Sequence, residues 1–158
     1  MKNYSIEIKW ALIFSAAALV WMFIEKSVGL HDVMIDKHPI YTNLFGIVAI
    51  VLYVLALRDK KNNFFDGKMD WRQGFISGII LTAMITLLSP VCQYITNTFI
   101  SPDYFTNAIN YADEHKLMKR EDAVMYFNLK SYIMQGIFGS LSMGVVTAAI
   151  VAYFMKSK

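Results

Sequence analysis

One apolar stretch of the sequence carries hydroxyl and amide side chains that could bind a ligand. Between residues 74 and 97 a small or polar residue returns every three or four positions, which places all of them on one face of a helix. The face consists of Gly74, Gly78, Thr82, Thr86, Ser89, Gln93 and Asn97. Hydroxyls and amides can hydrogen-bond a neutral molecule. The candidate binding residues within the membrane are Thr82, Thr86, Ser89 and Gln93 on this face, together with Gln135 in a later apolar stretch.

A second group of residues, in and just before the segment LHDVMIDKH, could bind a metal ion through carboxylate or imidazole groups. The group consists of Glu25, His31, Asp32, Asp36 and His38. The two histidines lack the i, i+4 spacing of a helical metal-binding pair, and no cysteine joins them. We find no nucleophile elbow and no phosphate-binding glycine loop. The sequence therefore predicts solvated loop charges here, with no metal site, no catalytic residues and no cofactor.

Four long apolar segments must position these residues. The stretches without Asp, Glu, Lys or Arg are residues 10–24, 39–57, 73–100 and 131–155. A helix needs roughly 17–25 mainly apolar residues to cross a membrane. The last three stretches qualify, and the first qualifies if it begins near Tyr4, with Glu7 and Lys9 reaching back to the interface. We predict an all-α fold, a four-helix transmembrane bundle forming a single integral membrane domain (1–158), with spans at about 4–25, 39–57, 73–98 and 131–155.

The last span has a small-residue face of its own. Small residues four positions apart let two helix backbones approach closely, which matters because lipid supplies no hydrophobic drive between helices. The predicted helix-packing residues of this small-xxx-small pattern are Gly74, Gly78, Gly136, Ser140 and Gly144. If Gln73 and Met155 lie at equal depth, antiparallel packing brings Gln93 to Gln135, Ser89 to Gly139 and Thr86 to Ser142.

Pro90 and the segment after the third span carry further local signals. Because proline has no backbone N–H, Pro90 predicts a kink and frees the carbonyl of Thr86 for another partner, such as a nearby hydroxyl. Ser101 and Pro102 are typical of a helix start, and apolar residues then recur at helical spacing. We predict a partly helical, amphipathic outer segment at about 101–130, lying on the membrane surface or folded over the bundle.

The distribution of basic residues predicts the orientation. Of the 15 lysines and arginines, nine lie on the side of the termini. These nine are Lys2, Lys9, Arg58, Lys60, Lys61, Lys68, Arg72, Lys156 and Lys158. The positive-inside rule then places both termini in the cytoplasm. The net charge of +3 comes without a basic patch of interleaved aromatics, so no nucleic-acid partner is expected.

Three stretches give the chain a family resemblance. They are YVLALRDKKNNFFDGKMDWRQGFISG, LLSPVCQYITNTFISPDYF and EDAVMYFNLKSY. With them the chain resembles, over nearly its whole length, a family of small bacterial membrane proteins, mainly from Bacteroidetes, classed as a domain of unknown function. The resemblance implies an integral protein of the bacterial cytoplasmic (inner) membrane with four spans and an outer segment after the third. It implies no activity, cofactor or catalytic residue.

Two classes of function are the leading hypotheses, and a metalloenzyme that acts at the outer face is a distant third. The first is a non-enzymatic membrane protein that acts through helix–helix interaction, as a homo-oligomer or as an accessory subunit of another membrane protein. The alternative is a binder or carrier of a small neutral or lipidic molecule within the bundle. Charge-coupled transport is disfavoured because the last three charge-free stretches contain no ionisable residue for such coupling. The sequence leaves enzymatic activity undecided and favours its absence.

Overall fold

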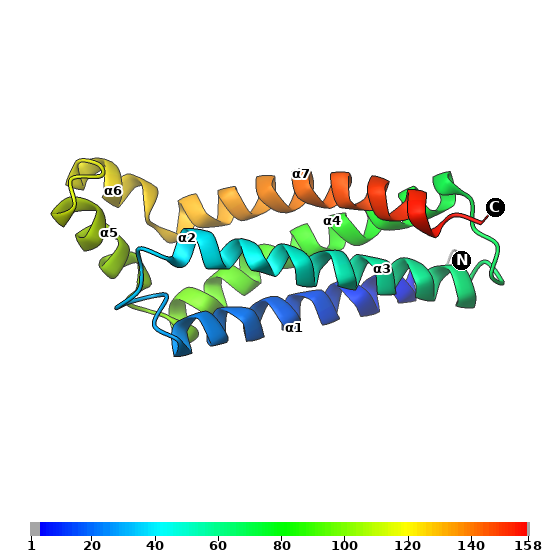
Figure 1. Cartoon of the computed structure of the whole chain (residues 1–158), viewed down its shortest axis with the longest axis horizontal. Helices are drawn as coiled ribbons and strands as arrows, with labels where there is room; N and C mark the ends of the chain where they lie inside the picture. Colours follow the sequence, from blue (N-terminus) through cyan, green and yellow to red (C-terminus); the bar gives the residue numbers. More distant parts are fainter. Residues whose placement is uncertain (1–3, 158) are drawn as a thin grey trace.

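The computed structural model describes residues 4–157, which form a bundle of four long helices (Figure 1). The first is α1 (Ser5–Ser27). The second runs through α2 (His38–Tyr41), the 3-10 turn η1 (Thr42–Leu44) and α3 (Phe45–Asn63). The third joins α4 (Trp71–Ile95) to the π-helical turn η2 (Thr96–Ile100), and the fourth is α7 (Leu129–Met155). Two short helices, α5 (Tyr104–Glu114) and α6 (Arg120–Tyr126), cover one end of the bundle.

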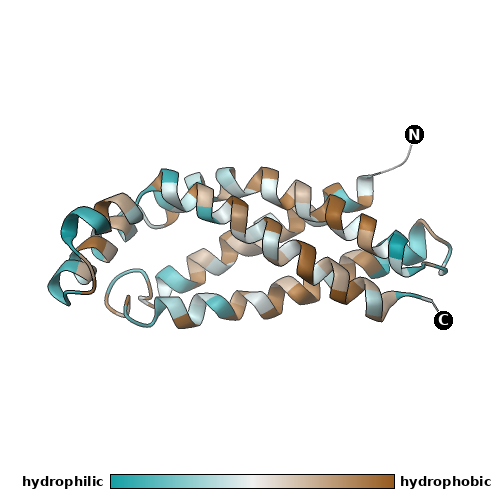
Figure 2. Ribbon diagram, turned by 90° about the horizontal axis from the view of Figure 1, so that it is seen from above, coloured by the Kyte–Doolittle hydropathy of each residue, from teal (hydrophilic) through white to brown (hydrophobic). Residues whose placement is uncertain are grey.

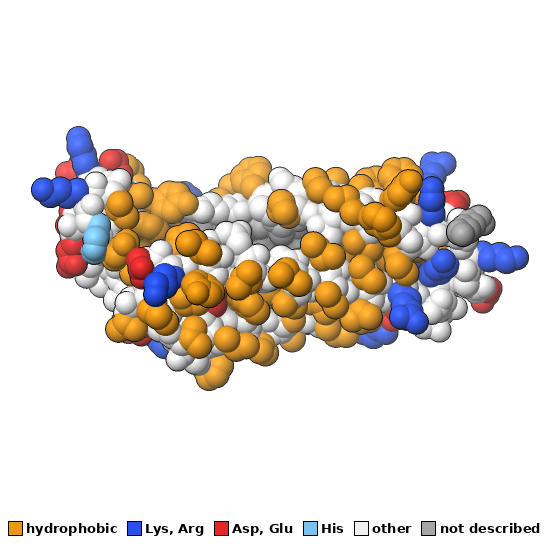
Figure 3. All heavy atoms as spheres, viewed as in Figure 1, with side chains coloured by type: hydrophobic (Ala, Val, Ile, Leu, Met, Phe, Trp, Pro, Cys, Tyr) orange, Lys and Arg blue, Asp and Glu red, His pale blue; other side chains and the backbone are white. Residues whose placement is uncertain are grey.

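Each long helix is long and apolar enough to cross a membrane. The candidate spans are Ser5–Ser27, His38–Asn63, Trp71–Ile100 and Leu129–Met155, with mean hydropathies of 1.7 to 2.2. Hydrophobic side chains cover the body of the bundle, and most charged side chains gather at its two ends (Figure 3). The ribbon shows the same sorting, with hydrophilic residues concentrated at the ends (Figure 2). The predicted all-α bundle of four apolar helices is confirmed.

Both ends of the chain lie at one end of the bundle, opposite α5 and α6 (Figure 1). Of the nine basic residues used to predict orientation, Lys2 and Lys158 lie outside the described residues. The segment at about 101–130 is partly helical, as predicted, but α5 begins at Tyr104 and not at Pro102; the side of the membrane on which it lies stays a prediction. Its buried side chains are Tyr104, Ala108 and Ala112, which follow one another at i, i+4 spacing on the face toward the bundle.

A close contact between α4 and α7 runs along their small residues. A methyl group added at Gly78 would lie 2.6 Å from Cβ of Ala148, and one at Gly74 would lie 3.2 Å from Cβ of Ala152. Further along, the hydroxyls of Thr86 and Ser140 are hydrogen-bonded at 2.8 Å. At Gly78 an added methyl would overlap the opposing helix, whereas at Gly74 it would make a tight contact.

The predicted depth of the two helices relative to each other is wrong by two residues. Thr86 is bonded to Ser140, whereas Ser142 is exposed on the outer face of α7. Gln93 lies beside Gly136 and forms no hydrogen bond with Gln135 among the described residues. The prediction aligned the ends of the charge-free stretches, but the close approach of glycine and alanine backbones sets the register.

The third span remains helical through Pro90. The carbonyl of Thr86, which loses its N–H partner to the proline, accepts a hydrogen bond of 3.0 Å from the Ser89 hydroxyl. A neighbouring hydroxyl therefore satisfies the free carbonyl, as expected for a proline within the membrane. The bend itself stays a prediction.

A buried ion pair joins three helices near the chain ends. Lys60 Nζ lies 2.9 Å from Glu7 Oε1, and the Ser77 hydroxyl donates to the same oxygen at 2.7 Å. Glu7 is 2% exposed and Lys60 is 4% exposed. Glu7 therefore points into the bundle, where Lys60 on α3 neutralises it and Ser77 on α4 donates a hydrogen bond to it. Its depth relative to the membrane interface stays a prediction.

Gly78→Ala is predicted to destabilise the bundle by about 1–3 kcal/mol, the usual range for overpacking. The added methyl must push α7 away, because it meets the Ala148 Cβ and backbone. Thermal unfolding in detergent measures the effect. Gly139→Ala is the matched control, since nothing lies within 4 Å of its added methyl. Equal melting temperatures for the two variants would contradict the close contact.

Lys60→Met is predicted to destabilise the protein by about 3–5 kcal/mol, because it leaves the Glu7 carboxylate buried without a counter-ion. The double variant Glu7→Gln/Lys60→Met should recover much of this loss, since no charge then remains buried at the site. Lys68→Met, on an exposed residue at the same end of the bundle, is the control. The three variants are compared by thermal unfolding, and an unchanged Lys60→Met protein would refute the buried pair.

Candidate functional site

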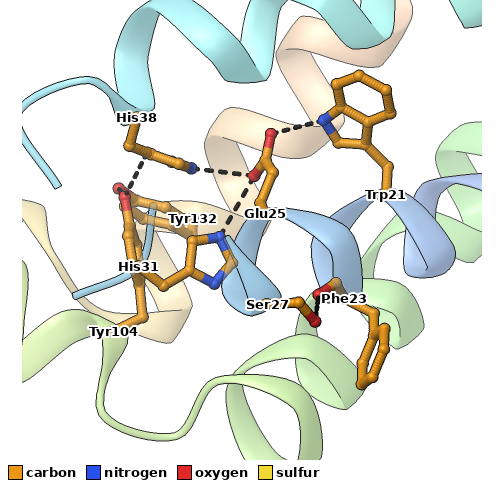
Figure 4. Close-up of polar contacts among 8 residues, drawn as sticks. All are labelled: Trp21, Phe23, Glu25, Ser27, His31, His38, Tyr104 and Tyr132. Carbon is orange, nitrogen blue, oxygen red and sulfur yellow. Dashed lines mark hydrogen bonds and ion pairs between the residues drawn. The ribbon is translucent and has the colours of Figure 1, made fainter. Parts of the chain in front are cut away.

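A carboxylate and two imidazoles converge at the end of the bundle that α5 and α6 cover (Figure 4). Glu25 Oε2 lies 3.2 Å from His31 Nε2 and 3.2 Å from His38 Nε2. Glu25 is 1% exposed and His31 is 3% exposed, so both are buried. The expectation of solvated loop charges is wrong for these three residues. It holds for Asp32 and Asp36, which are exposed.

The turn after α1 brings His31 back onto Glu25. Gly29 has a φ of +84°, a left-handed conformation that favours glycine and reverses the chain. The Leu30 N–H then donates to the Glu25 carbonyl at 2.9 Å, and Leu30 itself is buried. The Asn107 side chain on α5 donates to the His31 carbonyl at 3.0 Å. The loop is thus held to both α1 and the covering helix.

A second layer of side chains orients the cluster. The Trp21 indole N–H donates to Glu25 Oε1. His38 Nδ1 lies 3.2 Å from the Tyr104 hydroxyl, which in turn lies 3.0 Å from the Tyr132 hydroxyl. Burial raises the pKa of Tyr104 above its ordinary value, so its phenol stays protonated at neutral pH. The phenol can therefore donate to a neutral His38 or accept from it.

A cavity of about 660 Å³ adjoins the cluster and lies between the ends of all four spans. His31 and His38 form part of its wall, together with the amides of Gln93, Asn97 and Gln135. A second cavity of about 200 Å³ shares four wall residues with it and extends deeper, to Ile85, Ser89 and Ser140. The shared residues are Met22, Thr42, Gln93 and Thr96. The polar space therefore extends from the covered end into the bundle.

The predicted binding residues divide into two groups. Ser89, Gln93 and Gln135 line the two cavities. The hydroxyls of Thr82 and Thr86 are bonded within the protein. Thr82 donates to the Gly78 carbonyl and pairs with the Tyr53 hydroxyl, and Thr86 pairs with Ser140. A binding role for any of the five residues stays a prediction.

The predicted packing residues divide in the same way. Gly74, Gly78 and Gly144 lie against neighbouring helices, where an added methyl would approach Ala152, Ala148 and Thr82. Gly136 faces Gln93 across a wider gap and lines the main cavity. Tyr104 and Tyr132 carry no distinguishing sequence signal, because a tyrosine near a helix end also occurs as an ordinary interfacial anchor.

The fold and this site define a helical membrane protein with a polar cavity at one end of its bundle. The chain belongs to the family described as "Protein of unknown function (DUF4199)", whose model matches residues 9–157. The match confirms a family of unknown function over most of the chain and adds no activity, and the bacterial source stays a prediction. No curated protein and no solved structure matches the chain.

Tyr104→Phe is predicted to destabilise the protein by about 1–3 kcal/mol, because it removes the hydroxyl that lies between His38 and Tyr132 and leaves both without this partner. Thermal unfolding measures the loss. Tyr111→Phe is the control on the same helix, at a residue that stacks on the exposed His115. A Tyr104→Phe protein as stable as this control would show that the tyrosine does not support the cluster.

Proposed function

We propose that this protein binds a small neutral, hydrogen-bonding molecule, either free or as the head group of a lipid, in the cavity beneath α5 and α6. The observation that carries the proposal is the cavity of about 660 Å³ with amides and hydroxyls in its wall. Ligand sites in proteins are typically about 300–1,000 Å³, mostly apolar, with a few convergent polar groups. The proposed role is binding or carriage without catalysis.

The chemistry of the wall supports a neutral ligand. Among the described residues that line the main cavity none is Asp, Glu, Lys or Arg. The amides of Gln93, Asn97 and Gln135 can each donate and accept hydrogen bonds, so they suit hydroxyl, amide or carbonyl groups. Phe127 and Tyr126 supply aromatic surface on the same wall.

The rival hypothesis of function through helix–helix assembly has less support. It relied on the small-residue faces of the third and fourth spans, and Gly74, Gly78 and Gly144 pack against residues of the same chain. A homo-oligomer or an accessory-subunit contact would need another surface. We therefore favour the binding hypothesis that the sequence left as the alternative.

We further propose on which side of the membrane the cavity opens. We infer that the chain is one integral domain of a bacterial cytoplasmic membrane, with both termini inside as the charge bias predicts. The cavity then opens on the outer face of that membrane, since it lies at the opposite end from the chain termini (Figure 1).

Native mass spectrometry of the protein released gently from its own membrane tests the proposal. We expect a monomer with a reproducible additional mass, and that mass distinguishes a lipid from a free small molecule. Gln93→Leu and Gln135→Leu should each reduce its occupancy about tenfold or more, because each leaves a ligand group without a partner.

Ser142→Leu is the matched control, since Ser142 is exposed on the lipid-facing side of α7. A bare dimer or larger assembly that carries no additional mass would contradict the binding proposal and favour assembly. Equal occupancy in the glutamine variants and in the control would also overturn it.

A further inference from the structure

We propose that Glu25, His31 and His38 form a binding site for a divalent transition-metal ion of the Zn²⁺ class. One donor atom from each residue lies within 4.8 Å of the other two. Figure 4 shows both imidazoles directed at the same carboxylate. This site is separate from the small-molecule proposal, because its three ligands can hold an ion whether or not the cavity holds a molecule.

The separations match those around a bound ion. In a tetrahedral site with bonds of about 2.0–2.1 Å, neighbouring donor atoms lie about 3.3 Å apart. The two carboxylate–imidazole separations are both 3.2 Å. Only the approach of the two imidazoles to each other has to adjust, and both belong to residues at or beside a loop.

The types of donor select the class of metal. Two imidazoles and one carboxylate suit Zn²⁺ and its neighbours in the first transition row, whereas Ca²⁺ and Mg²⁺ prefer sites made of oxygen. Three protein ligands leave a coordination position for water or another donor. His31 and His38 line the main cavity, so a bound ion borders it.

The surrounding residues have the arrangement that supports metal ligands. Ligating imidazoles usually bond through their second nitrogen, and ligating carboxylates are bonded in turn. His38 Nδ1 pairs with the Tyr104 hydroxyl, and the Trp21 N–H donates to the carboxylate oxygen that faces away from the histidines. Glu25 also lies in the last turn of α1, where the helix dipole favours a cation.

His31 departs from this pattern at its second nitrogen. Its Nδ1 atom is buried and has no hydrogen-bond partner among the described residues. Its Nε2 faces the Glu25 carboxylate, which only accepts hydrogen bonds, so Nε2 carries a proton when no ion is bound, and an ion at this position would replace that proton.

Metal titration of the full-length protein in detergent tests this proposal. After chelator treatment, the protein is equilibrated with Zn²⁺ and analysed for bound metal, and Co²⁺ is added in parallel to report the ligands through its absorption spectrum. We expect a single ion per chain and a spectrum typical of a low-coordinate site. His31→Gln and His38→Gln should weaken binding at least about tenfold.

His115→Gln is the matched control, because His115 is the third histidine of the chain and is exposed. It should bind like the wild type. Retained binding in both cluster variants, or no saturable binding to the wild type, would overturn the proposal. In the latter case the cluster holds protons only.

Thermal unfolding keeps the test independent of how well the variants fold. Each protein is compared with its own metal-free form, since an ion that binds only the folded state raises its melting temperature. We expect the increase in the wild type and in His115→Gln, and its loss in the cluster variants. No increase in the wild type would contradict the site, whatever molecule the cavity proves to hold.

Discussion

The close approach of α4 and α7 is the constraint on which the rest of the bundle depends. In lipid, two helices gain little from hydrophobic contact, so backbone packing and hydrogen bonds must hold them together. Gly78 against Ala148 and Thr86 against Ser140 supply both. α4 begins beside the C-terminal part of α7 and then crosses toward α1. The C-terminal end of α4 therefore lies farther from α7 (Figure 1). The cavities lie toward that far end, lined by Gln93 on one helix and Gly136 on the other. Tight packing at one end therefore accompanies open, polar space at the other.

The length of the third span adds to this arrangement. With η2 it has 30 residues, or about 45 Å of helix, against a hydrocarbon core of about 30 Å. A helix of that length tilts or protrudes. In this bundle the excess includes the π-helical turn whose Thr96 and Asn97 line the main cavity. π-helical turns are uncommon and frequently occur at functional sites. The sequence already required the excess length, and the structure places it beside the histidines.

The predictable part of the structure is the part that depends on local sequence. Runs without charge identified the spans, and the spacing of Gly74, Gly78 and Gly144 identified faces that do pack closely. Pairings between distant residues could not be predicted in this way. From the sequence alone Glu7 is interpreted as an interfacial charge. Its pairing with Lys60 depends on how α3 packs against α1. Glu25, His31 and His38 read as loop charges, because their convergence depends on a reversal at Gly29 and on contacts with α5. The prediction of the register between α4 and α7 was wrong for a related reason, because the register depends on which small residues of the two helices meet.

The buried cluster around Glu7 and the buried cluster around Glu25 differ in how completely their own side chains satisfy the carboxylate. At the end of the chain termini, the Glu7 carboxylate is neutralised by a lysine and bonded by the Ser77 hydroxyl. That cluster is complete, and it ties α1 to α3 and α4. At the other end Glu25 is bonded by two imidazoles and an indole, and one buried nitrogen of His31 has no partner among the described residues. Buried carboxylates are stable when a positive charge compensates them. The first cluster obtains that charge from its own chain. The second adjoins a cavity, and a bound cation would place a positive charge beside its carboxylate.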